Sequence, residues 1–164
     1  MSRFEEQAAE IMASSWSYPG LMERKAEELL LVFSRNNSLG TWSTWSIFLH
    51  NMQFFIRRIE WPRRLDRLEL TASSPSTFGS ESMIRKSSAE AIVDSAVFLF
   101  NDERQQETCE LTIDGVYGSV SLPWNSNPFS WIRNRSGSEE FDLWLAQAEN
   151  AADACLPQSS YKGV

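Results

Sequence analysis

The sequence predicts an α+β domain in which an antiparallel sheet of about four strands is covered on one face by three N-terminal helices and one C-terminal helix. Apolar residues recur at helical spacing through the first third of the chain and again near its end. Between these parts, short strand-like segments flank a turn dipeptide. We expect one domain over residues 1–157, because 164 residues suit a single core, and a flexible tail over 158–164.

The first two helices are predicted from a capping signal and two apolar stripes. Ser2 and Glu5 have the spacing of a capping box, so the first helix is expected over residues 3–16. A second stripe follows the break at residues 18–20. Its members are Met22, Ala26, Leu29, Leu30 and Phe33. Short connections favour antiparallel neighbours, so we expect these two helices and the next one to form a layer.

The stretch from Thr41 to Trp61 is predicted to be the central helix of the domain. At about 100° per residue its large apolar side chains fall on one arc of roughly 140°. They are Trp42, Trp45, Phe48, Leu49, Met52, Phe55, Ile56 and Ile59. Ile47 and Phe54 lie on the otherwise polar side, which indicates either a helix contacted on two sides or two exposed apolar residues. Pro62 ends the helix, because it disfavours the α conformation of the preceding residue.

Two strands and a long loop are expected next. Residues 65–72 alternate between apolar and polar side chains, which predicts a strand. Residues 73–88 contain seven serines and are expected to be a long loop. Residues 92–100 end in a very apolar run and are predicted to be a strand, with a helix beginning at Ser87 as the alternative.

A β-hairpin gives the clearest local signal. Strands over residues 107–113 and 116–122 flank Asp114-Gly115, a dipeptide that suits a two-residue type I′ turn. The register that follows from this turn puts apolar residues on one face and polar residues on the other. The pattern is that of a sheet covered on one side only.

The segment 123–137 is rich in Pro, Asn and aromatic residues. Trp124, Phe129 and Trp131 either fold back over the core or form an exposed anchor for a partner. Arg133 and Arg135 follow them directly.

The last helix is predicted to begin at Ser138 and to end at Pro157. Glu139 and Glu140 would lie in its first turn, where the helix dipole favours negative charge. Its apolar stripe is Phe141, Trp144, Leu145, Ala148, Ala152 and Cys155.

Charge is unevenly distributed along the chain. The net charge is −7, which argues against a general nucleic-acid binder. Residues 87–164 hold 12 acidic and 4 basic residues, whereas residues 1–86 are nearly balanced. An acidic half either attracts a basic partner or only solvates the surface.

The two cysteines, Cys109 and Cys155, do not suggest a disulfide scaffold, and we expect buried free thiols in a reducing cytoplasm. The first residues lack the apolar run of a secretion signal. No apolar stretch approaches the roughly 20 residues that span a bilayer, so a membrane is not an expected partner.

No motif indicates catalysis, a metal or a cofactor. His50 is the only histidine, and zinc, nucleotide-binding and nucleophile-elbow motifs are lacking. We expect His50 to be a solvent-facing helical residue, with a general base near Asn51 and Arg57 as the alternative.

One basic cluster surrounds Trp61. Its members are Arg57, Arg58, Arg63, Arg64 and Arg67. Arginine with tryptophan is typical of protein-binding hot spots and also of phosphate-binding surfaces. The alternative is pairing of these arginines with the acidic half of the chain.

These observations favour a non-enzymatic, acidic protein-binding module. Its concrete form would be a bacterial immunity protein or other microbial inhibitor that neutralises a toxin or another basic partner. The expected partner-binding residues are Trp124, Phe129, Trp131, Arg133, Arg135, Trp61, Arg63 and Arg64. The alternatives are an enzyme or small-ligand protein with a pocket near His50 and residues 73–88, and a nucleic-acid mimic or binder.

Overall fold

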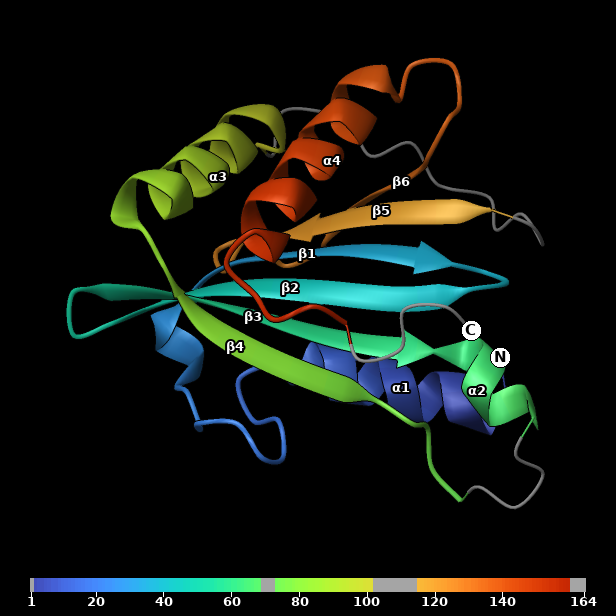
Figure 1. Ribbon diagram of the computed structural model, residues 1–164. Coiled ribbons are helices and arrows are strands. Elements are labelled where there is room, and N and C mark those ends of the chain that lie inside the picture. The colour runs from blue at the N-terminus through green and yellow to red at the C-terminus, as the bar shows by residue number, and fades with distance from the viewer. Residues whose placement is uncertain (1, 69–72, 102–114, 160–164) are drawn as a thin grey trace.

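The fold is a six-stranded antiparallel sheet with helices against both faces (Figure 1). The computed structural model describes residues 2–68, 73–101 and 115–159. The sheet order is β4-β3-β2-β1-β5-β6. The strands are β1 (Leu29–Asn37), β2 (Thr41–His50), β3 (Gln53–Pro62), β4 (Phe78–Ile84), β5 (Val116–Ser121) and β6 (Phe129–Ile132). The predicted layout, with about four strands and every helix on one face, is therefore wrong.

The helices form two separate layers. The helices are α1 (Arg3–Ala13), the short 3-10 helix η1 (Ala26–Glu28), α2 (Arg63–Leu68), α3 (Lys86–Leu99) and α4 (Glu139–Asp153). Helices α3 and α4 cover one face, the α3/α4 face, and α1 lies against the other, the α1 face (Figure 1). The predicted layer of three N-terminal helices is wrong, since only the first of them forms.

The predicted central helix is a β-hairpin. β2 and β3 pair along their whole length, from Thr41 with Pro62 to His50 with Gln53. Asn51 and Met52 both have positive φ, 48° and 64°, as a type I′ turn requires. These strands are buried on both faces, so their apolar residues do not alternate with polar ones. Large apolar residues on both faces of a strand fit a helical arc as well, and the turn lacks the glycine that would have marked it.

Three further elements differ from prediction. The second predicted helix is η1 followed by β1, in which Leu31 and Phe33 alternate into the core. Residues 65–68, the start of the predicted strand 65–72, belong to α2, and residues 69–72 lie outside the described part of the chain. The predicted loop 73–88 contains β4 and the first turn of α3.

The strand predicted over residues 92–100 is wrong, because these residues belong to α3, the alternative that begins near Ser87. The buried residues of α3 have helical spacing. They are Ala89, Ile92, Ala96 and Leu99.

The first and last helices confirm their predictions. The Ser2 amide donates to Glu5 Oε2 at 2.6 Å, and the Glu5 amide donates to Ser2 Oγ at 3.3 Å, so the capping box is complete. Helix α1 ends at Ala13, three residues before the predicted end at residue 16. Helix α4 ends at Asp153, before the predicted end at Pro157, and buries most of its predicted apolar stripe.

The predicted DG hairpin is described only in part. β5 forms and pairs with β1 and β6. Residues 107–113 and Asp114 lie outside the described residues, and so does the predicted register.

Two cores hold the layers together. On the α3/α4 face an aromatic cluster joins the helices to the sheet. It includes Phe33, Trp45, Phe100, Trp131 and Trp144. The ring of Trp131 lies directly over Gly118, where a Cβ atom would come within 2.3 Å of it. On the α1 face the core consists of Ala8, Met12, Ile59 and Trp61, with partly buried neighbours.

Candidate functional site

The candidate site lies at one end of the sheet, which we call the hairpin end. It comprises the β2–β3 turn at residues 50–53 and the β5–β6 loop at residues 122–128. The strand register places both there, because β1 begins beside Phe48 at Leu29 and Val32 pairs with Ser121, the last residue of β5. The site is built from two loop tips at the same end of the sheet, as is common for binding surfaces.

Two large apolar side chains project from these loops. Met52 is 86% exposed in the β2–β3 turn, and Trp124 is 62% exposed in the β5–β6 loop. All seven tryptophans lie in described residues, and Trp124 alone is exposed. The other tryptophans pack in the two cores or are half-buried, whereas Trp124 belongs to neither core.

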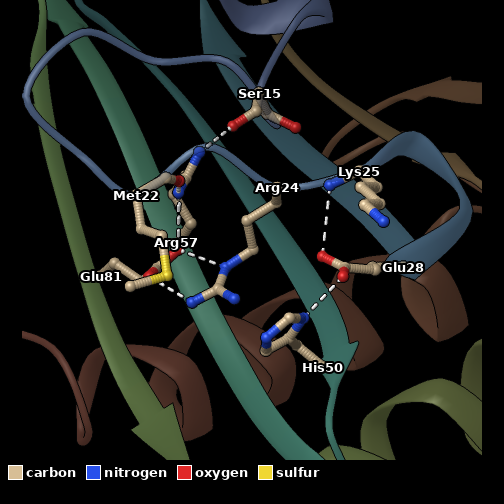
Figure 2. Close-up of polar contacts among 8 residues, drawn as sticks. All are labelled: Ser15, Met22, Arg24, Lys25, Glu28, His50, Arg57 and Glu81. Carbon is tan, nitrogen blue, oxygen red and sulfur yellow. Dashed lines mark hydrogen bonds and ion pairs between the residues drawn. The ribbon is translucent and has the colours of Figure 1, made fainter.

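A linker between α1 and β1, residues 14–28, crosses the α1 face near this end and is held there by Arg57 (Figure 2). Arg57 is completely buried. Its Nη1 donates to the Ser15 carbonyl at 2.6 Å, and its Nη2 donates to the Met22 carbonyl. Its Nε donates to Glu81 Oε2 at 2.9 Å. One side chain of β3 therefore fixes two points of the linker and the neighbouring strand β4.

Arg24 adds a second buried guanidinium from the linker itself. Its Nε donates to Glu81 Oε2 at 2.9 Å, and its guanidinium carbon lies 3.9 Å from the ring centroid of Phe55. Burial lowers the pKa of Arg57, and the Glu81 carboxylate opposes that shift. The guanidiniums of Arg24 and Arg57 thus share the Glu81 carboxylate. The Phe55 ring stabilises Arg24 further, and the two linker carbonyls stabilise Arg57.

His50 fastens the linker to the β2–β3 turn (Figure 2). Its Nδ1 lies 2.6 Å from Glu28 Oε1, and its Nε2 lies 3.0 Å from Asn51 Nδ2. The Lys25 amide donates to the other carboxylate oxygen of Glu28, Oε2, at 3.2 Å. The hydrogen bond from His50 is the main reason that the pKa of Glu28 is lowered. His50 therefore has a structural partner on each ring nitrogen and lies on a strand, so its predicted place on a helix is wrong.

The described residues offer no arrangement for a metal ion, since no three His, Cys, Asp or Glu side chains gather among them. Among the same residues, none of the helices has the length and apolar character needed to cross a bilayer. The segment 73–88, which the pocket alternative treats as a loop, contains β4 and the start of α3.

The predicted binding residues Trp61, Arg63 and Arg64 lie at the opposite end of the sheet. Trp61 is only 2% exposed, and its Nε1 donates to Asp66. Arg63 donates to Glu5 and to the Ser38 carbonyl, whereas Arg64 is exposed. In this fold Trp61 serves the α1 core, and of the three predicted binding residues here only Arg64 presents an exposed side chain.

The predicted aromatic segment divides into two parts. Phe129 and Trp131 belong to β6 and pack on Phe100 in the core. Trp131 is 5% exposed and folds back over the core, whereas Trp124 is 62% exposed, and its role as an anchor for a partner stays a prediction. Arg133 pairs with Asp142, and Arg135 is exposed.

Arginines of the sheet also pair with acidic residues of α4. Arg35 Nη1 lies 2.7 Å from Glu149 Oε2, and Arg58 Nη1 lies 2.9 Å from Asp153 Oδ1. Burial raises the pKa of Glu149 against the attraction of Arg35. Acidic residues of the C-terminal half thus hold α4 to the sheet. For Arg58, this is the predicted alternative in which the arginine cluster pairs with the acidic half of the chain.

Sequence reasoning missed Met52 as an exposed residue. The helical pattern places it on a buried arc, and only its position in a turn exposes it. The sequence His50-Asn51-Met52-Gln53 has one weak turn signal, Asn51, which tolerates positive φ.

Comparison of the chain with protein-family models, with curated protein sequences and with solved structures gives no match, so the site must be interpreted from its own geometry.

Proposed function

We propose that this chain is an acidic protein-binding module whose partner is a basic protein. Its concrete form would be an inhibitor, such as a bacterial immunity protein that neutralises a toxin. The observation that supports this most is Trp124, an exposed tryptophan in a loop at the hairpin end. Tryptophan is enriched among the residues that dominate binding energy in protein interfaces.

Met52 supports the same surface. β5 is separated from β2 and β3 by two to three strand spacings, roughly 10–15 Å across the sheet. The register pairs Ser121 with Val32 and Val32 with Ser46, so the β2–β3 turn also projects beyond the end of β5. Trp124 and Met52 both fit within one interface of standard size. Methionine adapts its shape to irregular apolar surfaces, whereas tryptophan gives a rigid anchor.

The loops are held in place before any partner arrives. The Asn125 amide donates to the Leu122 carbonyl at 3.0 Å and closes the turn that carries Trp124. His50 and Glu28 tie the β2–β3 turn to the linker. A preorganised surface loses less conformational entropy on binding.

Because the net charge of the chain is −7, we expect the partner to be positively charged. A net negative protein attracts a basic partner over several ångströms and speeds encounter, mainly at low salt. The exposed acidic residues that would contribute to this attraction include Glu23, Glu27, Asp94 and Glu139. The apolar anchors would then account for the lifetime of the complex.

Capture of partners from an extract of the native host, followed by affinity measurement, tests this function. We expect one dominant basic partner, bound at least about 30-fold more weakly by the Trp124→Ala variant, as for a hot-spot residue. Raising the salt from about 50 to 500 mM should slow association about tenfold.

The matched control is Leu39→Ala. Leu39 is also exposed, at 51%, but lies in the β1–β2 turn at the opposite end of the sheet. Its substitution should leave the affinity unchanged. An affinity that depends neither on salt nor on Trp124 would rule out the proposed mode of binding.

A further inference from the structure

We propose that two copies of this chain associate through β4. The two strands would run antiparallel across a two-fold axis at Glu81 and join two sheets into one. This inference does not rest on the proposed function, because it uses a different surface of the molecule.

Within the described part of the chain, β4 forms a regular edge of the sheet. It is the end strand of the sheet, and its seven residues pair with β3 without a bulge. Among the described residues, Gly79–Met83 have no backbone hydrogen bond to any segment other than β3. Natural edge strands are usually protected by proline, lysine, bulges or short length. The β4 sequence FGSESMI has no proline or lysine, whereas the other edge, β6, has only four residues.

The one charge on this edge is already neutralised. Glu81 would face Glu81 of the second copy, and bare like charges opposite each other destabilise a sheet. Each Glu81 carboxylate, however, is held by Arg24 and Arg57, with Nη2 atoms at 2.5 Å and 2.8 Å. The guanidiniums outnumber the carboxylates, so the axis position carries no uncompensated negative charge.

The strand is complementary to itself in this register. Pairing about Glu81 sets Met83 opposite Gly79 of the second copy, and Ser80 opposite Ser82. The space above Gly79 is occupied by the ring of Tyr18, since a Cβ atom there would lie 2.3 Å from Cε1. Met83, 64% exposed in the single chain, would therefore lie against Tyr18 of the second copy. Sulfur–aromatic contacts of this kind are favourable.

Met22 extends the same surface. It is 65% exposed, and its carbonyl and the Glu81 carboxylate both contact Nη2 of Arg57 (Figure 2). The two Met22 side chains would meet near the axis and be removed from water together with Met83. This self-complementarity favours a second copy over a strand from another protein, because one two-fold operation provides a partner for both Met22 and Met83.

Sedimentation equilibrium of the full chain, from low to several hundred micromolar, tests the proposal. We expect a reversible rise in mass from 18.8 kDa to twice that value. Met83→Lys should weaken dimerisation at least tenfold, because it replaces the apolar side chain that would contact Tyr18 of the second copy with a cation that loses its hydration there. The control Leu39→Lys, also at an exposed apolar position, should dimerise like the wild type.

A disulfide test reads the register directly. Ser80→Cys and Ser82→Cys chains, mixed and oxidised, should cross-link to each other much faster than either does to itself, since only the mixed pair is directly opposed. A chain that stays monomeric, a dimer that tolerates Met83→Lys, or cross-linking without preference for the mixed pair would overturn the proposal. A monomer that pairs β4 only with a different protein would overturn it as well.

Discussion

Arg57→Met should lower the free energy of unfolding by about 3–5 kcal/mol, the usual result of removing one member of a buried charged network. Arg57 is fully buried and supplies donors to the Ser15 and Met22 carbonyls and to Glu81. Methionine fills much of the volume but leaves those carbonyls without their donor and Glu81 with Arg24 alone. Urea unfolding followed by tryptophan fluorescence measures the loss.

The matched control is Arg64→Met. Arg64 lies on α2, is exposed, and has no ion pair among the described residues. Its replacement should change the free energy of unfolding by less than about 0.5 kcal/mol. Equal losses in the two variants would mean that Arg57 does not hold the linker to the sheet.

Asp142→Ala should cost about 2–4 kcal/mol, since hydrogen bonds to a charged group contribute more than neutral ones. The Asp142 carboxylate accepts from Trp131 Nε1 at 3.0 Å, from the Asn134 amide at 2.8 Å and from Ser138 Oγ at 2.7 Å. Arg133 adds a positive charge, and its Nε lies 3.3 Å from Asp142 Oδ1. The Asp142 side chain thus joins β6 and the following turn to the start of α4.

The stability contributed by Asp142 should depend on pH. Burial alone would raise the pKa of Asp142, but the hydrogen bonds from Asn134, Ser138 and Trp131, together with Arg133, outweigh it and lower the pKa below 3.8. The ionised form therefore stabilises the fold above about pH 4, and that contribution is lost as the pH falls through the lowered pKa. The difference in stability between wild type and Asp142→Ala should narrow from pH 7 towards pH 3. A constant difference would contradict this account.

Local signals predicted the first and last helices well. The Ser2–Glu5 capping box and the α4 stripe depend only on residues within one or two turns of each other. Such signals can be recognised without knowing what packs against them.

The centre of the sheet could not be predicted in the same way. β2 and β3 are covered by α3 and α4 on one face and by α1 on the other, so both sides of each strand are buried and carry large apolar side chains. That pattern has no period of two, and it matched a helical arc by length and composition. The failure lies in tertiary context, since burial on both faces is a property of the whole fold.

The site was predicted only in part. Trp124 and Trp131 belong to the same aromatic segment, and their different exposure follows from β6, which turns Trp131 onto Gly118. The sequence puts Arg57 in a surface cluster, although it is buried in the linker network. The partners that decide these positions are distant in sequence.

Hydrogen exchange on the chain, alone and saturated with its captured basic partner, tests the central claim most directly. We predict that the amides of residues 50–53 and 122–128 gain protection while those of the β1–β2 turn at residues 38–40 do not. Protection confined to the opposite end, around Trp61 and Arg64, with none at the hairpin end would contradict it.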